Sequence, residues 1–315
     1  MTSRVKSGTS HSRVFIDGEA GTTGLQIRER LAALADVELM SIDPALRKDQ
    51  TARLDMMRNV DLIVLCLPDD AAKEAVALAD HLGDDAPKIV DASTAHRVAP
   101  GWVYGFAELD ARQADAIRSA QRVTNPGCYP TGAIALLRPL IAAGLVAGDH
   151  PITVNAVSGY SGGGKSMIEA YEVSNTAPVF ELYGLGLDHK HVPELMAYSG
   201  LTRRPIFVPS VGNFRQGMLV SIPLHLDTLP GKPRTDDIHH ALSKFYSGAE
   251  RVRVMPLTSA TRIEPEALND SDDLELFVYG NKNGDQAVLV ARLDNLGKGA
   301  AGAAVQNLKL MLGMT

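Results

Sequence analysis

Hydrophobic residues in the first 125 positions recur in short runs that are separated by segments with helical spacing. Runs rich in β-branched residues predict strands over residues 14–17, 37–43, 61–68 and 88–93. The run DLIVLCLP at 61–68 is apolar almost throughout, as expected for a strand that is covered on both faces. The segments between the strands predict helices over residues 25–35, 48–58 and 73–83. This alternation predicts a doubly wound parallel sheet of the α/β class.

The pattern changes after residue 125, where strands follow one another with few helices between them. An apolar helix is predicted over residues 133–145. Strand-like runs occupy residues 152–158, 204–212, 217–226, 251–257, 274–280 and 286–294. They predict an α+β domain with a mixed or antiparallel sheet. Residues 295–314 have the alanine-rich, amphipathic pattern of a final helix, which we expect to pack on the first domain.

Composition places the chain among folded globular proteins. Apolar residues make up 45% of its 315 residues and charged residues 22%, and the net charge of −6 argues against a nucleic-acid binder. No apolar run approaches the roughly 20 residues that span a bilayer, so no membrane association is expected. Residues 1–12 are polar and predict a disordered tail. In the expected cytoplasmic location, Cys66 and Cys128 remain thiols.

A glycine-rich turn follows the first predicted strand and precedes the first predicted helix. Its glycines are Gly18, Gly21 and Gly24. Glycines in this position let the backbone approach a pyrophosphate, and the helix N-terminus offers N–H donors. The spacing differs from G-x-G-x-x-G, so a ligand-free tight turn is the alternative. The context of strand, turn and helix favours a Rossmann-type dinucleotide site.

The end of the second predicted strand bears on the choice of dinucleotide. An acidic residue there usually binds the ribose hydroxyl of NAD, whereas an arginine nearby accommodates the phosphate of NADP. Asp43 is present, but Arg47 and Lys48 follow it closely. The two cations favour NADP, and the alternative is a solvated basic pair.

The sequence NPGCYPTG places Cys128 at the start of the apolar helix, which we expect to run from about Pro130. A helix N-terminus stabilises a thiolate and makes the sulfur a competent nucleophile near neutral pH. Cys66 lies inside the apolar run DLIVLCLP and is expected to be an inert core residue. Cys128 is therefore the candidate nucleophile.

A nucleophilic cysteine that performs acyl chemistry needs an acid/base partner. His189 and His191 stand out in the segment HKHVPE, and their spacing places both rings on the same side of an extended segment. No further cysteine or histidine completes a ligand set for zinc. The two imidazoles are therefore expected to serve proton transfer, with no metal site.

A phosphotransferase is the rival interpretation. Residues 159–166, GYSGGGKS, satisfy the pattern G-x-x-x-x-G-K-[ST] after a predicted strand. The pattern lies in the middle of the chain, and no downstream strand ends in a convincing magnesium-binding aspartate. The loop is expected instead to bind an anionic part of the substrate through its backbone N–H groups.

The chain resembles the N-acetyl-γ-glutamyl-phosphate reductases of arginine biosynthesis, specifically the shorter of their two sequence types. The resemblance covers the chain from about residue 14 to its C-terminus. Its blocks are VFIDGEAGTTGLQI, DASTAHR, YGFAEL, NPGCYPTG, VSGYSGGGKS, HKHVPEL, FRQGML and DNLGKGAAGAAVQNLKLMLG. The related aspartate-semialdehyde and glyceraldehyde-phosphate dehydrogenases share the architecture but differ around the cysteine.

The resemblance implies reduction of N-acetyl-glutamyl 5-phosphate to the 5-semialdehyde by NADPH, with release of phosphate. It makes Cys128 the nucleophile that forms a thioester and His189 the acid/base, with His191 still a candidate for that role. The residues implied for the substrate site are Ser158, Gly159, Ser161, His191, Glu194 and Arg215. The residues expected at NADP(H), including those from the patterns above, are Gly18, Gly21, Thr22, Thr23, Gly24, Arg47, Lys48, Ser93, Asn295 and Lys298.

The expected organisation is an NADP-binding domain, formed by residues 13–127 and 296–315, and a catalytic and oligomerisation domain over residues 128–295. We expect a homo-oligomer, either a dimer or a tetramer, that acts on small molecules. A lysine-pathway substrate that is one methylene longer stays open, because one methylene carries only about 1–3 kcal/mol of discrimination. A non-catalytic NADP-sensing protein is a further alternative.

Overall fold

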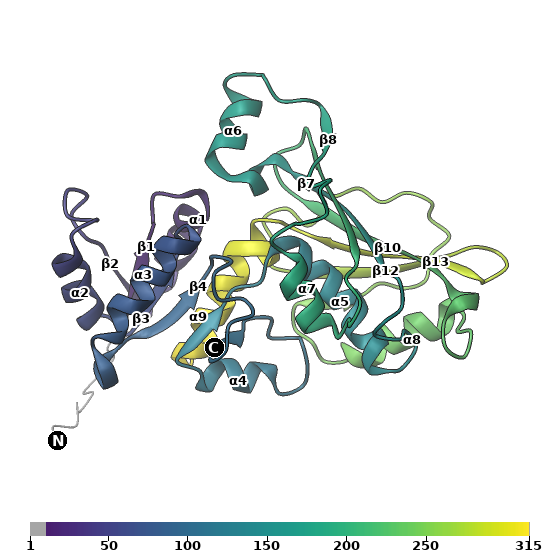
Figure 1. The fold of residues 1–315 in the computed structure, drawn as a ribbon, viewed down its shortest axis with the longest axis horizontal. Helices are drawn as coiled ribbons and strands as arrows, with labels where there is room; N and C mark the ends of the chain where they lie inside the picture. Colours follow the sequence, from purple (N-terminus) through teal and green to yellow (C-terminus); the bar gives the residue numbers. More distant parts are fainter. Residues whose placement is uncertain (1–10, 315) are drawn as a thin grey trace. The chain divides into compact units, whose positions relative to one another are not determined.

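The computed structural model describes residues 11–314, so most of the tail expected over residues 1–12 lies outside the described residues. The chain divides into two compact units. The first contains the described residues up to Gly105, together with Asp115–Asn125 and residues 304–314. The second contains Phe106–Ala114 and Pro126–Ala303. Figure 1 shows the elements of both units along the chain.

The first unit is built on a parallel sheet, sheet A, with strand order β2-β1-β3-β4-β6-β5. The strands are β1 (Ser12–Asp17), β2 (Val37–Met40), β3 (Leu62–Leu65), β4 (Lys88–Asp91), β5 (Val103–Tyr104) and β6 (Arg122–Thr124). All the pairings are parallel, so the carboxyl ends of the strands share one edge. The predicted doubly wound α/β fold is confirmed.

Helices cover both faces of sheet A. Those with residues in this unit are α1 (Thr22–Ala32), α2 (Gln50–Arg58), α3 (Asp69–Asp80), α4 (Gln113–Ser119), α9 (Gly302–Leu312) and the 3₁₀ turn η1 (Gly83–Asp85). Met57 of α2 and Val76 of α3 join Phe15, Ile63 and Ile89 of the strands in one buried cluster, which places both helices on the same face. The crossover through α1 runs the opposite way along the sheet, so its right-handed path takes α1 to the other face.

The second unit contains a mixed sheet of seven strands, sheet B, with order β11-β12-β13-β10-β7-β9-β8. The strands are β7 (Thr153–Gly159), β8 (Phe180–Leu182), β9 (Ile206–Gly212), β10 (Met218–His225), β11 (Val252–Val254), β12 (Leu274–Gly280) and β13 (Gln286–Leu293). The pairs β7/β9 and β11/β12 are parallel and the others antiparallel. The predicted mixed sheet is confirmed.

Helices pack on one face of sheet B. The elements are α5 (Cys128–Ala142), α6 (Gly164–Glu172), α7 (Val192–Ser199), α8 (Thr235–Phe245) and the short turns η2 (Tyr160–Gly163), η3 (Leu226–Thr228) and η4 (Gly297–Ala301). The helix α5 contacts β10, β12 and β13, while α7 packs on α5 and α8 contacts β11 and β12. The helix α6 has no buried residue and contacts the turn η2 that precedes it.

Three boundaries differ from the sequence predictions. The strand expected over residues 37–43 ends at Met40, because the Asp43 side chain accepts a hydrogen bond from Ala45 N–H and initiates a turn. The apolar helix starts at Cys128 rather than near Pro130. The last helix is preceded by the π-helical turn η4, so the amphipathic pattern of residues 295–314 is not one continuous α-helix.

Candidate active site

Cys128 is the first residue of α5. Gly127 is the N-cap residue with extended backbone angles, and its carbonyl accepts the hydrogen bond from Thr131 N–H that starts the helix. Pro130 sits in the first turn, where no intrahelical N–H is required. The sulfur therefore lies at the positive end of a helix dipole with no acidic residue in the first turn, which favours the thiolate. Cys66 and Cys128 form no disulfide in the part of the chain that the structure describes.

A buried carboxylate holds the backbone just before the cysteine. Glu194, in the first turn of α7, accepts a hydrogen bond from Gly127 N–H at 3.0 Å and is 1% exposed. This contact brings together two segments that are 67 residues apart in sequence. We expected Glu194 at the substrate, and the structure places its carboxylate on the N-cap of α5.

Aromatic rings and imidazoles surround the start of α5. The ring of Tyr129 lies 6.3 Å from that of His189 and 5.9 Å from that of His191. The two imidazoles are 4.7 Å apart, so the structure brings the predicted pair together. Phe207 of β9 packs edge-on to His189 at 5.1 Å. The predicted acid/base candidates thus share a cluster with the residue that follows the cysteine.

The proton positions of His189 follow from its hydrogen bonding. The backbone N–H of His191 donates to His189 Nδ1 at 3.2 Å. A ring nitrogen that accepts a hydrogen bond carries no proton, so neutral His189 holds its proton on Nε2. His189 is half-buried, whereas His191 is 8% exposed. In this tautomer, Nε2–H of His189 is a hydrogen-bond donor.

A tyrosine that the sequence analysis missed completes this cluster. The hydroxyl of Tyr183 donates to that of Tyr129 at 3.0 Å, and Tyr129 donates to the carbonyl of Ser210 at 3.1 Å. Burial raises the pKa of Tyr183 to about 12, and the charge of Cys128 acts in the same direction. Burial raises the pKa of Tyr129 further still. Both hydroxyls are therefore protonated at neutral pH beside the cysteine.

The end of β7 and the turn η2 that follows it carry three of the residues expected at the substrate. Ser158 and Ser161 are both 2% exposed, and Ser161 N–H donates to the carbonyl of Arg215. A Cβ on Gly159 would lie 2.5 Å from Gln216 N, so only glycine permits this approach. The loop is thereby tied to the segment 213–217.

Of the predicted residues, Ser161 and Asn295 meet in one hydrogen-bond network. Asn295 Nδ2 donates to Ser161 Oγ at 2.9 Å, and Asn295 Oδ1 accepts from Gly217 N–H at 2.8 Å. The next turn along the chain, η4, is π-helical, a feature that often marks functional sites. A Cβ on Gly299 in this turn would lie 2.9 Å from Cys128 Cβ. The turn η4 therefore packs directly against Cys128.

Two cations expected at ligands have protein partners. Lys298 Nζ contacts both carboxylate oxygens of Glu108, at 2.9 and 2.7 Å, and lies 5.4 Å from the ring of Phe106. The Lys298 side chain is 2% exposed and that of Glu108 8%. Arg215 forms an ion pair with Glu172 of α6, which also accepts a hydrogen bond from Tyr160. Lys298 and Arg215 are therefore both paired with carboxylates of this chain.

The glycine turn in the first unit has the geometry of a dinucleotide cradle. Gly18 has φ of +92°, and a Cβ on Gly24 would lie 2.4 Å from the carbonyl oxygen of Gly18. Gly21 is the N-cap residue of α1, which begins at Thr22 and Thr23. The turn follows β1, next to the point where the strand order reverses between β1 and β3. Bare backbone at this edge fits a cofactor pyrophosphate.

Ser93 lies at the same edge, held by a buried carboxylate. Asp91 ends β4, is fully buried, and accepts hydrogen bonds from Ser93 N–H at 2.9 Å and Ser93 Oγ at 2.8 Å. His96 Nδ1 lies 2.6 Å from the same carboxylate, and its ring stacks on Trp102 at 4.3 Å. The Asp91–His96 pair was missed, although both residues belong to the block DASTAHR.

Arg47 and Lys48, the two cations expected at the NADP phosphate, are exposed in the turn that follows β2.

Within residues 11–314, no group of three or more His, Cys, Asp or Glu side chains has the geometry to hold a metal ion. No helix in the same range is long and apolar enough to cross a membrane. The segment over residues 159–166 contains the 3₁₀ turn η2 and the start of α6. Lys165 lies in the first turn of α6 and is exposed.

The fold is that of known dehydrogenases. Aspartate semialdehyde dehydrogenase II from Vibrio cholerae superposes with a TM-score of 0.71 at 14% identity, over 96% of this chain and 99% of that one. The enzyme from Candida albicans with NADP superposes with a TM-score of 0.65 at 13% identity, over 96% of this chain and 99% of that one. At this level of identity the likeness concerns the fold alone.

Sequence comparisons reach closer relatives. Residues 128–295 match the family model of the semialdehyde dehydrogenase dimerisation domain. A relative from Pseudomonas putida named N-acetyl-gamma-glutamyl-phosphate reductase 2 is 52% identical, over 95% of this chain and 96% of its own length. A relative from Rhizobium etli named N-acetyl-gamma-glutamyl-phosphate reductase is 54% identical, over 95% and 98%. The chain therefore belongs to the N-acetyl-γ-glutamyl-phosphate reductase family.

Proposed function

We propose that this chain reduces N-acetyl-L-glutamyl 5-phosphate to the 5-semialdehyde with NADPH, with Cys128 as the nucleophile, and serves arginine biosynthesis in the cytoplasm. The observation that carries the proposal is the place of Cys128 at the N-terminus of α5, directly before Tyr129, whose ring lies 6.3 Å from that of His189 and 5.9 Å from that of His191. Membership of the reductase family supports the substrate and the cofactor. The same membership disfavours a phosphotransferase built on residues 159–166 and a protein that only senses NADP.

The acyl transfer follows from the cysteine's surroundings. The Cys128 thiolate attacks the acyl carbon, the carbon–oxygen bond to phosphate breaks, and a thioester to Cys128 forms. The N–H groups at the start of α5 are placed to stabilise the negative oxygen that develops, an effect worth about 3 kcal/mol per donor in other enzymes. Tyr183 and Tyr129 stay neutral beside the cysteine and donate their hydroxyl protons within the protein, to Tyr129 and to the carbonyl of Ser210.

The reduction requires proton transfer at the same oxygen. NADPH, when bound, supplies the hydride that converts the thioester to a thiohemiacetal. His189 Nε2–H donates a hydrogen bond to that oxygen, and a full proton comes from the imidazolium form of the ring, in which Nδ1 has exchanged its contact with His191 N–H for a proton. The neutral ring that remains takes the proton back when the carbon–sulfur bond breaks. The aldehyde is then released and the Cys128 thiolate is regenerated. Glu194 acts through Gly127 by fixing the N-cap of α5, which is a positioning role.

The two units are proposed to divide the work. The glycine turn with Thr22, Thr23 and Ser93 makes the first unit the NADP-binding one. In the second unit, Ser158, Gly159 and Ser161 are proposed to bind the acyl phosphate. Asn295 and Lys298, expected near the nicotinamide, have contacts with Ser161 and Glu108 that favour a supporting role around η4. Arg215 becomes an anion partner only if it exchanges Glu172 for substrate.

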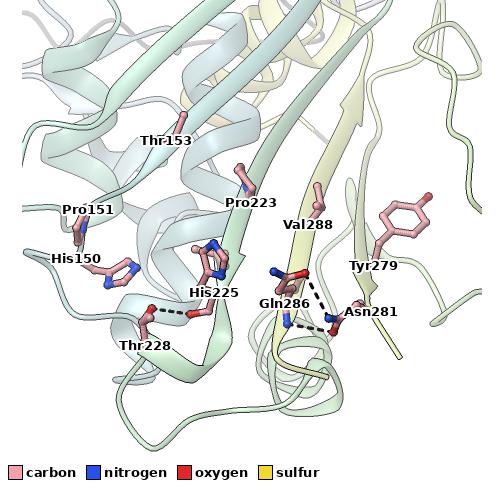
Figure 2. Close-up of a pocket in the computed structure, with 13 residues that line it drawn as sticks. His150, Pro151, Thr153, Pro223, His225, Thr228, Tyr279, Asn281, Gln286 and Val288 are labelled. Carbon is pink, nitrogen blue, oxygen red and sulfur yellow. Dashed lines mark hydrogen bonds between the residues drawn. The ribbon is translucent and has the colours of Figure 1, made fainter. Parts of the chain in front are cut away.

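We propose that a second copy of the chain covers the open face of sheet B, the face opposite to α5 and α8. This face carries Thr153, Pro223, His225, Tyr279 and Val288 and holds an open cavity of about 1050 Å³ (Figure 2). Val288, the third residue of the inner strand β13, is 40% exposed, which is high for a valine in an inner strand. The match of residues 128–295 to a dimerisation domain supports this assignment.

The decisive experiment is phosphate-dependent reduction of NADP⁺ with N-acetylglutamate 5-semialdehyde, the reverse reaction. Cys128→Ser is expected to abolish it, and Cys66→Ser to leave it unchanged. The semialdehyde that is one methylene longer, assayed alongside, is expected to react more slowly. Full turnover by Cys128→Ser would overturn the mechanism, and a preference for the longer aldehyde would overturn the substrate.

A further inference from the structure

Three polar side chains converge beyond the carboxyl end of β2. Arg28 extends from α1, Ser41 directly follows β2, and Glu19 belongs to the glycine turn after β1. Arg28 Nη1 lies 2.5 Å from Glu19 Oε2 and 3.0 Å from Ser41 Oγ. Ser41 Oγ donates to the same Glu19 oxygen at 3.2 Å. One carboxylate oxygen is therefore bound by a guanidinium and a hydroxyl together.

In Rossmann-type domains, side chains at the end of the second strand contact the 2′ position of the cofactor ribose. The residue found there is Ser41, which has no charge to repel a phosphate. Asp43, the acid that the sequence offered for the ribose, uses its carboxylate to accept from Ala45 N–H in the following turn. The structure thus replaces the acidic ribose acceptor of NAD-binding domains with a hydroxyl and an arginine.

The donor set matches the chemistry of a phosphate monoester. A guanidinium presents several N–H donors in a planar fork and binds phosphate with charge-assisted hydrogen bonds. The Glu19 carboxylate lies between Arg28 and Ser41, in the place where a phosphate group would accept hydrogen bonds from both. The side chains of Arg28 and Glu19 are 43% and 34% exposed, so an incoming ligand reaches both.

We propose that Arg28 and Ser41 bind the 2′-phosphate of NADP(H), and that Glu19 holds Arg28 in place until the phosphate displaces its carboxylate. This inference deepens the proposed function, since it rests on NADP(H) as the cofactor. It also reassigns the phosphate contact from Arg47 and Lys48, which the sequence favoured. Those two side chains are exposed in the turn beyond Ser41 and contribute long-range attraction.

The test measures the dissociation constants of NADP⁺ and NAD⁺ by calorimetry on the purified full chain without substrate. Arg28→Ala is expected to weaken NADP⁺ binding about 10- to 100-fold, the range of charge-assisted hydrogen bonds, and NAD⁺ binding less than about 3-fold. Ser41→Ala is expected to weaken NADP⁺ about 3- to 10-fold. Arg28→Lys, which keeps the charge without the fork, is expected to fall between wild type and Arg28→Ala.

The matched control is the double variant Arg47→Ala/Lys48→Ala, which removes two exposed cations near the same edge. It is expected to keep most of the preference for NADP⁺ over NAD⁺. Glu19→Gln is expected to bind NADP⁺ more tightly than wild type, because the competing carboxylate charge is gone. Thermal unfolding of each variant checks that the domain is intact.

Three outcomes would overturn the inference: an unchanged NADP⁺ preference in Arg28→Ala, its loss in the Arg47/Lys48 double variant, or selective loss of NAD⁺ binding in Glu19→Gln. The last would make Glu19 a ribose acceptor instead. Absence of any NADP⁺ preference in the wild-type chain would count against the proposed function itself. The two failures are therefore distinguishable.

Discussion

Gly299 packs against Cys128 so closely that a Cβ added to the glycine would lie 2.9 Å from the cysteine's Cβ and 3.1 Å from the carbonyl oxygen of Asp294. The contact joins a π-helical turn to the first residue of α5. Any side chain at position 299 must displace either the turn or the proposed nucleophile. The glycine therefore helps to fix the sulfur's position.

Gly299→Ala is expected to lower kcat by about 10- to 100-fold, because small displacements of a reacting group have costs of this size. The rate of alkylation of Cys128 by iodoacetamide is expected to change as well. Gly186→Ala is the control, since nothing lies within 4 Å of a Cβ there. Wild-type kcat and alkylation in Gly299→Ala would refute the positioning role.

The two cysteines are expected to differ sharply in reactivity. Burial, with the charges of Asp91 and Asp17 acting in the same direction, raises the pKa of Cys66 to about 12. Brief treatment with iodoacetamide at pH 8, followed by mass spectrometry of the peptides, is expected to label Cys128 and spare Cys66. Equal labelling of the native protein would contradict this assignment.

The raised pKa of Cys66 also predicts a loss of stability in alkali. The unfolded thiol loses its proton near its ordinary pKa of 9.0, whereas the folded one keeps it to about 12. Stability from this group is therefore complete below pH 9 and is lost as pH rises towards 12, by at most about 4 kcal/mol at 1.36 kcal/mol per unit. Urea unfolding of wild type and Cys66→Ala across this range should show a shallower decline in the variant.

Removal of Lys298 is expected to destabilise the second unit by about 3–5 kcal/mol, because it leaves the Glu108 carboxylate buried without its cation. The double variant Lys298→Met/Glu108→Leu is expected to recover most of the loss. Urea unfolding of both single variants and the double variant gives the coupling free energy. Additive losses would show that the two side chains do not act as a pair.

Substitution of the imidazoles separates their roles. His189→Asn is expected to lower kcat by about 100-fold or more, as for loss of a general acid/base. His191→Asn is expected to have a smaller effect, because the contact to His189 Nδ1 comes from the backbone of His191 and survives the substitution. Single-turnover rates measure the chemical step. A larger loss at position 191 would transfer the acid/base role to His191.

The open face of sheet B is expected to hold the oligomer together. Val288→Glu places a charge in the middle of that face and should shift the mass measured by light scattering towards one chain. Val98→Glu, at a comparably exposed valine of the first unit, serves as the control. A monomeric wild type, or an unchanged mass in Val288→Glu, would remove the basis for this interface.

Local pattern predicted much of the fold. The apolar run at 61–68 contains β3, and the alternating run at 286–294 contains β13. A strand buried on both faces is apolar throughout, whereas a strand buried on one face alternates between apolar and polar residues. Pro256 interrupts the run at 251–257, of which only Val252–Val254 is a strand. The candidate nucleophile was equally visible, since the turn residues beside Cys128 mark a helix start.

Pairing between distant residues was not visible. Lys298 and Glu108 are 190 positions apart, and a lysine in a sequence reads the same whether it meets a cofactor or a buried carboxylate. Tyr183 is hydrogen-bonded to Tyr129, which is 54 positions away, and no sequence motif predicts this contact. Arg28, in the middle of a helix, gave no sign that it meets Ser41.

The sequence by itself determined which segments become strands and helices, where the glycine turn lies, and that Cys128 opens a helix, because each of these depends on neighbours within a few residues. The tertiary structure decided which charges are paired, that Tyr183 meets Tyr129, and that Gly299 packs against Cys128. Those choices depend on packing and on the desolvation of groups far apart in the chain, and such contacts form only when the unit that holds them has folded.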